Sequence, residues 1–381
     1  MTIRYYIAVE DNAGTVVDLI QQPLSFSYEL GFSKRNVLQL QLSAYEPIDL
    51  QHDYLLRLWR RDTSITDEWR NVANYIFKTY DRSLSSSGRR GFMAYGASPE
   101  ELVQKAVIAY PAGTSQTRKN GDAAQVIAEF VRENSGSQAL VSNGRYVDHI
   151  TPLVVPTVSP VGINWQGSRA GKPLMEVCQD IVQYAKQNST RLDFRVNYSG
   201  GAYTFEVGIL GIDRTTGGLN PSTGLNGAGN APVLISPLLE NMRQYNDVFA
   251  RMNEANVIIA LGSGEQSDRL TAVATDTTSA GRSILAHRES IINATNETAS
   301  GLPQRAIAEL EEKVGRRNFV SIPDPTKVRL FTDYNVGDFV TVEDDTGERF
   351  NRQVISANVN VSLSGNNFIE QYTLEFDDIL P

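Results

Sequence analysis

The chain has 381 residues, of which 41% are hydrophobic and 21% charged, and its formal net charge is −9. This length exceeds one ordinary core and predicts about two to four domains. The acidic balance argues against tight wrapping of nucleic acid, because affinity for phosphates comes from clustered Lys and Arg. No stretch approaches the roughly 18 consecutive apolar residues of a membrane helix, and the start MTIRYYIAVEDNAG lacks the apolar run of a signal peptide. We therefore expect a globular protein assembled in the cytosol.

Residues 1–97 predict a first β-barrel domain built from successive strands. Alternation is clearest in VLQLQL, where Leu38, Leu40 and Leu42 share one face while Gln39 and Gln41 share the other. Such alternation is typical of a sheet with one dry face. The expected strands cover residues 4–9, 24–28, 37–42, 54–59, 75–83 and 90–95.

Residues 98–235 predict a middle domain that mixes helices and strands. The first helix is expected to begin at SPEE (98–101), with Ser98 as N-cap and Pro99 at the first helical position, and to run until Pro111. A second helix, AAQVIAEFVREN, is expected to follow Asp122, because its apolar residues form one stripe.

A third helix is expected over about 173–187, and two alternating runs around Ser199-Gly200-Gly201 predict a hairpin. The helix contains Cys178, the chain's single cysteine, which we expect to be a buried packing residue rather than a nucleophile. The glycine-rich segment 213–232 has no apolar face and is expected to be a long exposed loop, mobile on its own.

Residues 236–381 predict a second β-barrel domain. A helical insertion is expected near residues 302–317, where GLPQRAIAELEEKVGRR places apolar residues on one face. The expected strands cover residues 238–245, 248–252, 255–261, 269–275, 327–331, 339–343, 350–361 and 368–376.

The two β regions contain an ordered partial repeat, which is typical of duplicated architecture. Residues 28–43 match 249–263 through an Asn-Val pair that opens an apolar strand ending in Ser. Asp53 matches Asp338 before a strand, and 74–96 matches 352–376 as two long strands joined by SLSSSG or SLSG. The alternative is that any two antiparallel domains share such features. The repeat predicts that residues 1–97 superpose on parts of 238–381.

Four segments follow one another along the chain in a characteristic order: GFMAYGASPEELVQKAVIAYPAGT, GDAAQVIAEFVREN, ANVIIALGSGEQSDR and residues 299–342. In this order they resemble the siphophage tail hub proteins, which are related to the hub of contractile-phage baseplates. The resemblance implies an α+β, mainly β fold with two tail-tube-like barrel domains and a helix-containing middle domain. It also implies a homotrimer whose two barrels per subunit form a pseudo-sixfold ring at the tail tip of a virion.

Little in the sequence favours catalysis, so we expect no catalytic residue, cofactor or metal. His52, His149 and His287 are far apart, although Asp148 beside His149 leaves a His-carboxylate contact open. GSG at 262–264 is expected to be a turn rather than a phosphate loop, because it lacks the Lys-Ser/Thr pair of a P-loop. Five acids could form a cation site, but we expect a hairpin turn between two strands instead: Asp338, Glu343, Asp344, Asp345 and Glu348.

The resemblance, together with the internal repeat, leads us to expect a structural hub and not an enzyme. The partners that it implies are distal tail or tail-tube proteins, the tape-measure protein and fibre or spike proteins. DNA is expected only to pass through a channel whose residues are polar to acidic. Two alternatives stay open. One is a cell-wall or polysaccharide hydrolase on a β scaffold, and the other is a receptor- or carbohydrate-binding tail module.

Overall fold

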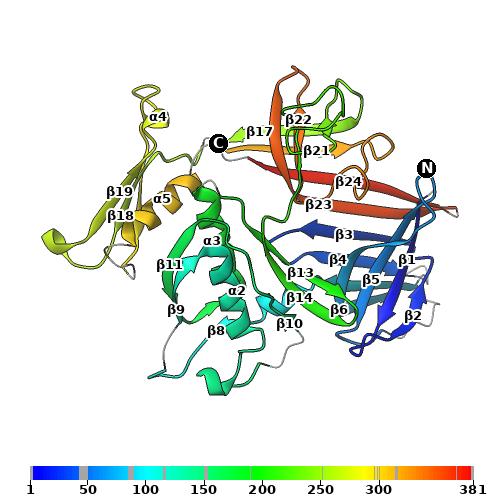
Figure 1. Ribbon diagram of the computed structural model, residues 1–381, viewed down its shortest axis with the longest axis horizontal. Helices are drawn as coiled ribbons and strands as arrows, with labels where there is room; N and C mark the ends of the chain where they lie inside the picture. Colours follow the sequence, from blue (N-terminus) through cyan, green and yellow to red (C-terminus); the bar gives the residue numbers. More distant parts are fainter. Residues whose placement is uncertain are drawn as a thin grey trace.

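The computed structural model is mainly β and shows three groups of elements: a large sheet, a helical middle region and a small projecting lobe (Figure 1). It describes residues 3–42, 50–84, 90–114, 117–149, 153–188, 190–250, 252–295, 297, 299, 301–313, 316–365 and 367–378. None of the helices in this described part has the length and apolar character needed to cross a membrane.

Within the described residues, fourteen strands form one sheet. Its members are β1 (Ile3–Glu10), β2 (Val16–Ile20), β3 (Ser25–Gly31), β4 (Val37–Leu42), β5 (Leu55–Asp62), β6 (Arg70–Leu84), β7 (Arg90–Ala97), β15 (Asp213–Arg214), β16 (Leu234–Ile235), β17 (Met242–Ala250), β21 (Arg316–Pro323), β22 (Phe339–Glu343), β23 (Arg349–Ser364) and β24 (Asn367–Asp378). The strands expected in residues 1–97 are all present, and β2 is an additional strand that the sequence analysis missed.

The first and last parts of the chain share this sheet and one hydrophobic core. Strand β3 pairs with β23 over seven register positions, and Ile3 of β1 pairs with Phe368 of β24. The core draws buried side chains from both ends of the chain, among them Leu40 and Val359. Two separate barrel domains are therefore not confirmed, because the strands assigned to each are hydrogen-bonded across the expected boundary.

The predicted repeat is present as a strand order. The first unit runs β3-β4-β7-β6-β5 and the second runs β17-β21-β24-β23-β22, with antiparallel pairing at every step. The match of residues 28–43 with 249–263 is wrong, since β4 corresponds to β21. Residues 257–261 belong instead to a different, three-stranded sheet.

Equivalent residues of the two units can be assigned from a row of register partners across four strands. In the first unit the row is Tyr28, Leu38, Gly96 and Phe77. In the second unit the row is Asp247, Phe319, Phe376 and Val354. The residue after Phe77 and the residue after Val354 each form a bulge in their strand, which confirms that these two positions correspond.

A second correspondence lies just before β5 and β22. Asp53 donates its N–H to Phe77 O at 2.9 Å, and Gly337 donates to Val354 O at 2.7 Å. Both residues have a positive φ, of 69° for Asp53 and 95° for Gly337, which is the left-handed backbone region. Asp53 therefore matches Gly337, and the sequence match of Asp53 with Asp338 is wrong by one residue.

The middle region has its own core, in which two helices pack on short sheets (Figure 1). Its elements are α1 (Glu101–Gln104), β8 (Val107–Ile108), β9 (Thr117–Asp122), α2 (Ala123–Asn134), η1 (Val141–Asn143), β10 (Leu153–Val154), β11 (Asn164–Arg169), β12 (Lys172–Pro173), α3 (Leu174–Gln187), β13 (Asp193–Ser199) and β14 (Ala202–Gly208). Helices α2 and α3 and the β13–β14 hairpin confirm the sequence expectations.

The first expected helix is much shorter than predicted. Helix α1 ends at Gln104, because the chain turns there into β8, whose Val107 pairs with Pro173 of β12. Ser98 is not its N-cap, since its hydroxyl accepts the Asn36 N–H at 2.9 Å and so ties the middle region to the first unit. Glu100 occupies the N-cap position.

The expected helical insertion is part of a larger lobe between β17 and β21. The lobe comprises β18 (Val257–Leu261), η2 (Gln266–Asp268), β19 (Thr271–Thr275), α4 (Thr277–Ala280), β20 (Glu289–Asn293) and α5 (Leu302–Lys313), around a small core of its own (Figure 1). The strand predicted at 327–331 is wrong, because Asp324 O accepts the N–H groups of Lys327 and Val328 in a turn.

Candidate functional site

The three histidines lie apart and none belongs to a catalytic set among the described residues. His52 is exposed and its Nδ1 lies 2.8 Å from Lys78 O, while His287 Nε2 lies 3.0 Å from Glu289 Oε1 at the surface. Burial lowers the pKa of the half-buried His149. The Asp148 carboxylate accepts the Val141 N–H at 2.6 Å, and His149 Nδ1 has no hydrogen-bond partner in the described part of the chain.

Cys178 is fully buried in α3, as expected, and burial raises the pKa of its thiol, which keeps it protonated and unreactive. The segment 262–264 is the predicted turn, since the Gly262 N–H donates to Leu270 O at 2.8 Å and the Leu270 N–H donates to Ser263 O at 2.9 Å.

The acids weighed as a cation site serve local structure. Asp338 accepts hydrogen bonds from Ile212 N, Arg214 Nε and Asn335 N, all within 3.0 Å. Asp344 caps the turn between β22 and β23 by accepting from Thr346 N and Glu348 N at 2.9 Å, which confirms the hairpin. Among the described residues there is no group of three or more side chains that could hold a metal ion.

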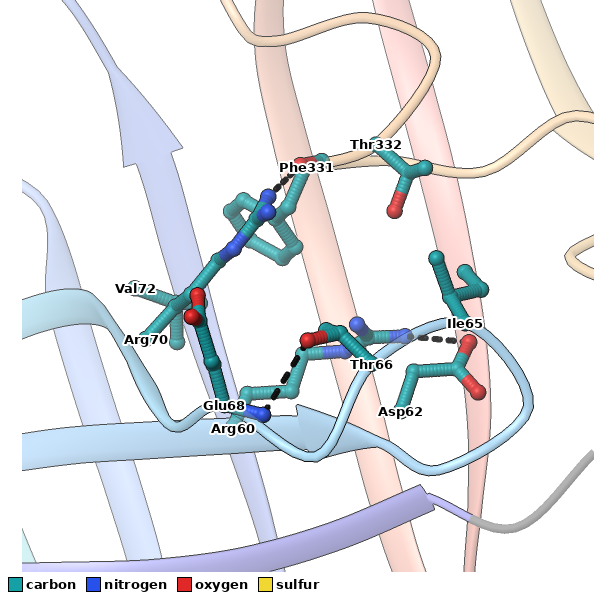
Figure 2. Close-up of a pocket in the computed structure, with 9 residues that line it drawn as sticks. All are labelled: Arg60, Asp62, Ile65, Thr66, Glu68, Arg70, Val72, Phe331 and Thr332. Atoms are coloured by element: carbon teal, nitrogen blue, oxygen red, sulfur yellow. Dashed lines mark hydrogen bonds and ion pairs between the residues drawn. The ribbon is translucent and has the colours of Figure 1, made fainter.

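A small, partly open pocket lies between the β5–β6 turn and the loop that contains Phe331 (Figure 2). Arg60 points to Asp62 at 3.9 Å, and Arg70 Nη1 donates to Phe331 O at 3.3 Å across it. Its free volume of about 20 Å³ holds about one water, which is too small for a substrate.

A more extensive feature is one face of an eight-strand run within the large sheet. The run is β17-β21-β24-β23-β3-β4-β7-β6, antiparallel throughout. Its dry face covers the shared core, and alternation places the other set of side chains on the opposite face. We call this opposite face the polar face and define it by Ser25, Ser27, Glu29, Gln39, Gln41, Thr79, Asp81, Ser83, Met93, Tyr95, Asn246, Val248, Val320, Asn358, Asn360, Ser362, Ile369, Gln371, Thr373 and Glu375.

The polar face carries many uncharged polar groups and no positive charge at these positions. Its charged members are Glu29, Asp81 and Glu375, all acidic. Their spacing leaves a wide neutral surface of Ser, Thr, Asn and Gln, which offers short-range hydrogen bonds but no cation to hold a phosphate.

A shallow groove of about 310 Å³ crosses this face where β3 meets β23. Ser25 Oγ donates to Gln41 Oε1 at 2.9 Å within it. The groove is lined by Ser25, Phe26, Ser27, Gln39, Gln41, Met93, Asn360, Val361, Ser362, Ile369 and Gln371, none of which is charged. Its lining is therefore uncharged and mixed, with the apolar Phe26, Met93, Val361 and Ile369 among polar side chains.

A buried ion pair fixes the sheet beneath the groove. Arg60 of β5 makes two hydrogen bonds to Glu370 of β24, Nε to Oε1 at 2.6 Å and Nη2 to Oε2 at 3.0 Å. Tyr5 donates to the same carboxylate, and its hydroxyl lies 3.0 Å from that of Tyr28. Burial raises the pKa of both phenols, so they remain protonated. The network joins β1, β3 and β5 to β24, and no local pattern in the sequence indicates it.

The sequence contains a signal for a polar sheet face but does not show which residues form it. The available signal was the alternation of uncharged polar residues in QLQL and in NVNVS. The sequence does not show that these two segments, more than 300 residues apart, lie on the two strands that flank β3.

No protein-family model and no curated protein matches the chain. Solved structures do. The 43 kDa tail protein of prophage MuSo2 from Shewanella oneidensis has a TM-score of 0.59 at 13% identity, over 99% of this chain and 98% of that one. The tail protein from Neisseria meningitidis MC58 has a TM-score of 0.54 at 11% identity, over 99% of this chain and 97% of that one. Prophage tail protein gp18 from Listeria monocytogenes has a TM-score of 0.51 at 8% identity, over 98% of this chain and 94% of that one.

These likenesses extend over nearly the full length of each chain, so the arrangement of all three regions is shared. The chain has the fold of prophage tail proteins. The resemblance read from the four sequence segments is confirmed at the level of the fold.

Proposed function

We propose that this tail-protein fold serves as the structural hub of a phage-type tail tip or baseplate, working as a homotrimer with a pseudo-sixfold ring. The observation that carries the proposal is the pair of five-strand units with one strand order, joined edge to edge in a single chain. Two units in each of three subunits give 2 × 3 = 6 similar elements around one axis. Such a ring matches sixfold and threefold partners at once.

The polar face supports a channel function. A ring that turned this face inward would present neutral and acidic groups to passing DNA or to a tape-measure protein. Acidic and neutral walls do not release counterions from DNA, so DNA would slide without salt-dependent trapping.

The remaining parts of the proposal concern partners and place. Distal tail or tail-tube proteins would contact the six similar units, while fibre or spike proteins would contact a middle region, residues 98–235, that repeats only three times. The division at residues 97 and 235 stays part of this proposal. The assembled protein would be a virion component at the tail tip.

The mass of the particle in solution tests the ring. Native mass spectrometry or light scattering is expected to give 3 × 42.1 ≈ 126 kDa at high protein concentration. A strictly monomeric protein across the accessible concentration range would overturn the trimer and, with it, the hub.

A hydrolase or a receptor-binding module remains the alternative, and no observation in the described residues favours either. The small pocket beside Phe331 holds about one water, and acids such as Asp338 and Asp344 are engaged in structural hydrogen bonds. Release of soluble fragments from purified peptidoglycan, lost on replacement of one acid, would support the hydrolase instead.

A further inference from the structure

The joint between the two units inside one chain is a strand pairing. Strand β23 is long: its first part pairs with β22, and residues 356–362 pair with residues 25–31 of β3. In this joint Val359 lies opposite Tyr28 and Val361 opposite Phe26, and all four side chains are buried. The long strand β23 of the second unit therefore pairs with β3, the edge strand of the first unit.

The corresponding strands at the two edges of the eight-strand run, β6 and β17, lack this joint in the described part of the chain. Strand β6 corresponds to β23, and β5 covers it only as far as Ile76, so beyond Phe77 its described residues pair on one side, with β7. Residues 79–84 are exposed, Leu84 to 70%. Strand β17 corresponds to β3 and is the last strand in the sheet order. Each edge of the eight-strand run thus carries one half of the same joint.

The internal joint fixes the register that a second copy would adopt. Val359 lies five residues after Val354, and Arg82 lies five residues after the equivalent Phe77. Asp247 is the equivalent of Tyr28 in the row across the sheet. Arg82 of one copy would therefore lie opposite Asp247 of the next, and Leu84 opposite Tyr245.

These facing residues suit one another chemically. Opposite charges directly across an antiparallel pair stabilise it, and Arg82 and Asp247 carry opposite charges. The Arg82 guanidinium lies 4.9 Å from the centre of the Tyr80 ring and 5.5 Å from that of Phe92, which hold it on the side of the sheet that the dry face occupies. Leu84 would lose its exposed apolar surface against the Tyr245 ring.

We propose that β6 of one copy pairs antiparallel with β17 of a second copy, with Arg82 opposite Asp247. The inference rests on the proposed ring and names the contact that builds it. Because two different edges meet at every boundary, the contact is head-to-tail and not that of a twofold dimer, and in the proposed trimer it closes after three copies. Three eight-strand runs would form one continuous sheet of 3 × 8 = 24 strands, with the polar face on one side throughout.

Disulfide trapping between full-length copies tests the register. Ser83 and Asn246 would face each other on the polar face, as Asn360 and Ser27 do within the chain. After mild oxidation, Ser83→Cys/Asn246→Cys is expected to give a non-reducing ladder that ends at three chains. A mixture of the two single variants is expected to stop at two, and native Cys178 is too deeply buried to take part.

Two matched pairs serve as controls. Ser27→Cys/Asn360→Cys is expected to form a disulfide within one chain and to leave its mass unchanged. Thr79→Cys/Asn246→Cys uses the same face, but Thr79 lies four residues along β6 from Ser83, about 13 Å at the usual strand rise. It is expected to give no ladder, because the Cα atoms of a disulfide lie within about 7 Å.

A charge reversal gives a readout without cysteines. Arg82→Glu is expected to weaken assembly about tenfold, because like charges would then face each other, and Arg82→Glu/Asp247→Arg is expected to recover most of that loss. Native mass spectrometry over a dilution series measures both.

The outcomes separate this inference from the proposed function. A 126 kDa trimer without the Ser83–Asn246 crosslink, while the intrachain control forms, would overturn the strand pairing and leave the ring standing. Equal crosslinking of the Thr79 control would overturn the register. An unmodified protein that stays monomeric would overturn the hub itself.

Discussion

At the scale of single residues, the buried Arg60–Glu370 pair joins the first and last parts of the shared sheet. Both side chains are nearly inaccessible, at 7% and 3% exposure, and they come from β5 and β24, near opposite ends of the chain. Removal of one partner of such a pair leaves a buried charge without compensation, whereas replacement of both by apolar groups removes the charge altogether.

Glu370→Ala is therefore expected to lower the free energy of unfolding by about 3–5 kcal/mol. Arg60→Met/Glu370→Leu is expected to lose much less, because no charge stays buried. Urea titration followed by circular dichroism measures both. The surface pair Lys172–Glu176, exposed to 46% and 49%, provides the control, and Glu176→Ala is expected to cost about 0.5 kcal/mol or less. Equal losses in Glu370→Ala and the double variant would show that packing, not charge, dominates this site.

At the scale of elements, the glycine-rich segment 213–232 is more ordered than its composition predicts. It is pinned at both ends by β15 and β16, which pair in parallel with β22, and in its middle by the buried Asn226. Asn226 Nδ2 donates to Asp213 O at 2.9 Å and to Thr215 O at 3.0 Å, and its Oδ1 accepts from two N–H groups of the loop, Ala228 and Asn230. A single amide thus replaces the apolar core that the loop lacks.

Asn226→Ala is expected to raise amide hydrogen exchange in residues 213–232 by about tenfold or more, since several buried partners lose their hydrogen bonds at once. Exchange measured by mass spectrometry on intact, folded protein reports it. Asn220 lies exposed in the same loop and accepts one hydrogen bond from Ser222 N, so Asn220→Ala is expected to change exchange little. A loop that exchanges fast already in the unchanged protein would contradict the role of Asn226.

Elements with local signals were predicted from the sequence, and elements that depend on distant partners were not. Helix α2 has its own N-cap in Asp122, whose Oδ1 accepts the Ala124 N–H at 3.1 Å, and the β13–β14 hairpin has its two-glycine turn. By contrast, β15 and β16 are two-residue strands that exist only because β22 lies beside them. Strand β21 was missed because the predicted helix was extended to residue 317, whereas α5 ends at Lys313.

At the scale of the molecule, the internal repeat was detectable in the sequence, but its register was not. The segments around SLSSSG and SLSG identified the long hairpins β6–β7 and β23–β24 correctly, because turn chemistry and strand length are local. The counterpart of β4 was misplaced, since about 65 residues of a separate lobe stand between β17 and its partner β21. The residues of the polar face could be identified only from the spatial order of all eight strands, which depends on distant pairings.

The lobe itself provides the last prediction. It leaves the large sheet at Ala250 and returns at Arg316, which are register partners, so a two-residue Asn-Gly turn can close the β17–β21 hairpin in place of residues 251–315. The shortened chain is expected to keep its strand circular dichroism and its trimeric mass, because the lobe has a separate core and lies outside the eight-strand run. Phe319→Ala, in the shared core beside that hairpin, is the opposing control and is expected to cost about 3–5 kcal/mol. Loss of the folded sheet on removal of the lobe would mean that α5, which packs beside α3, is needed to hold the middle region against the sheet.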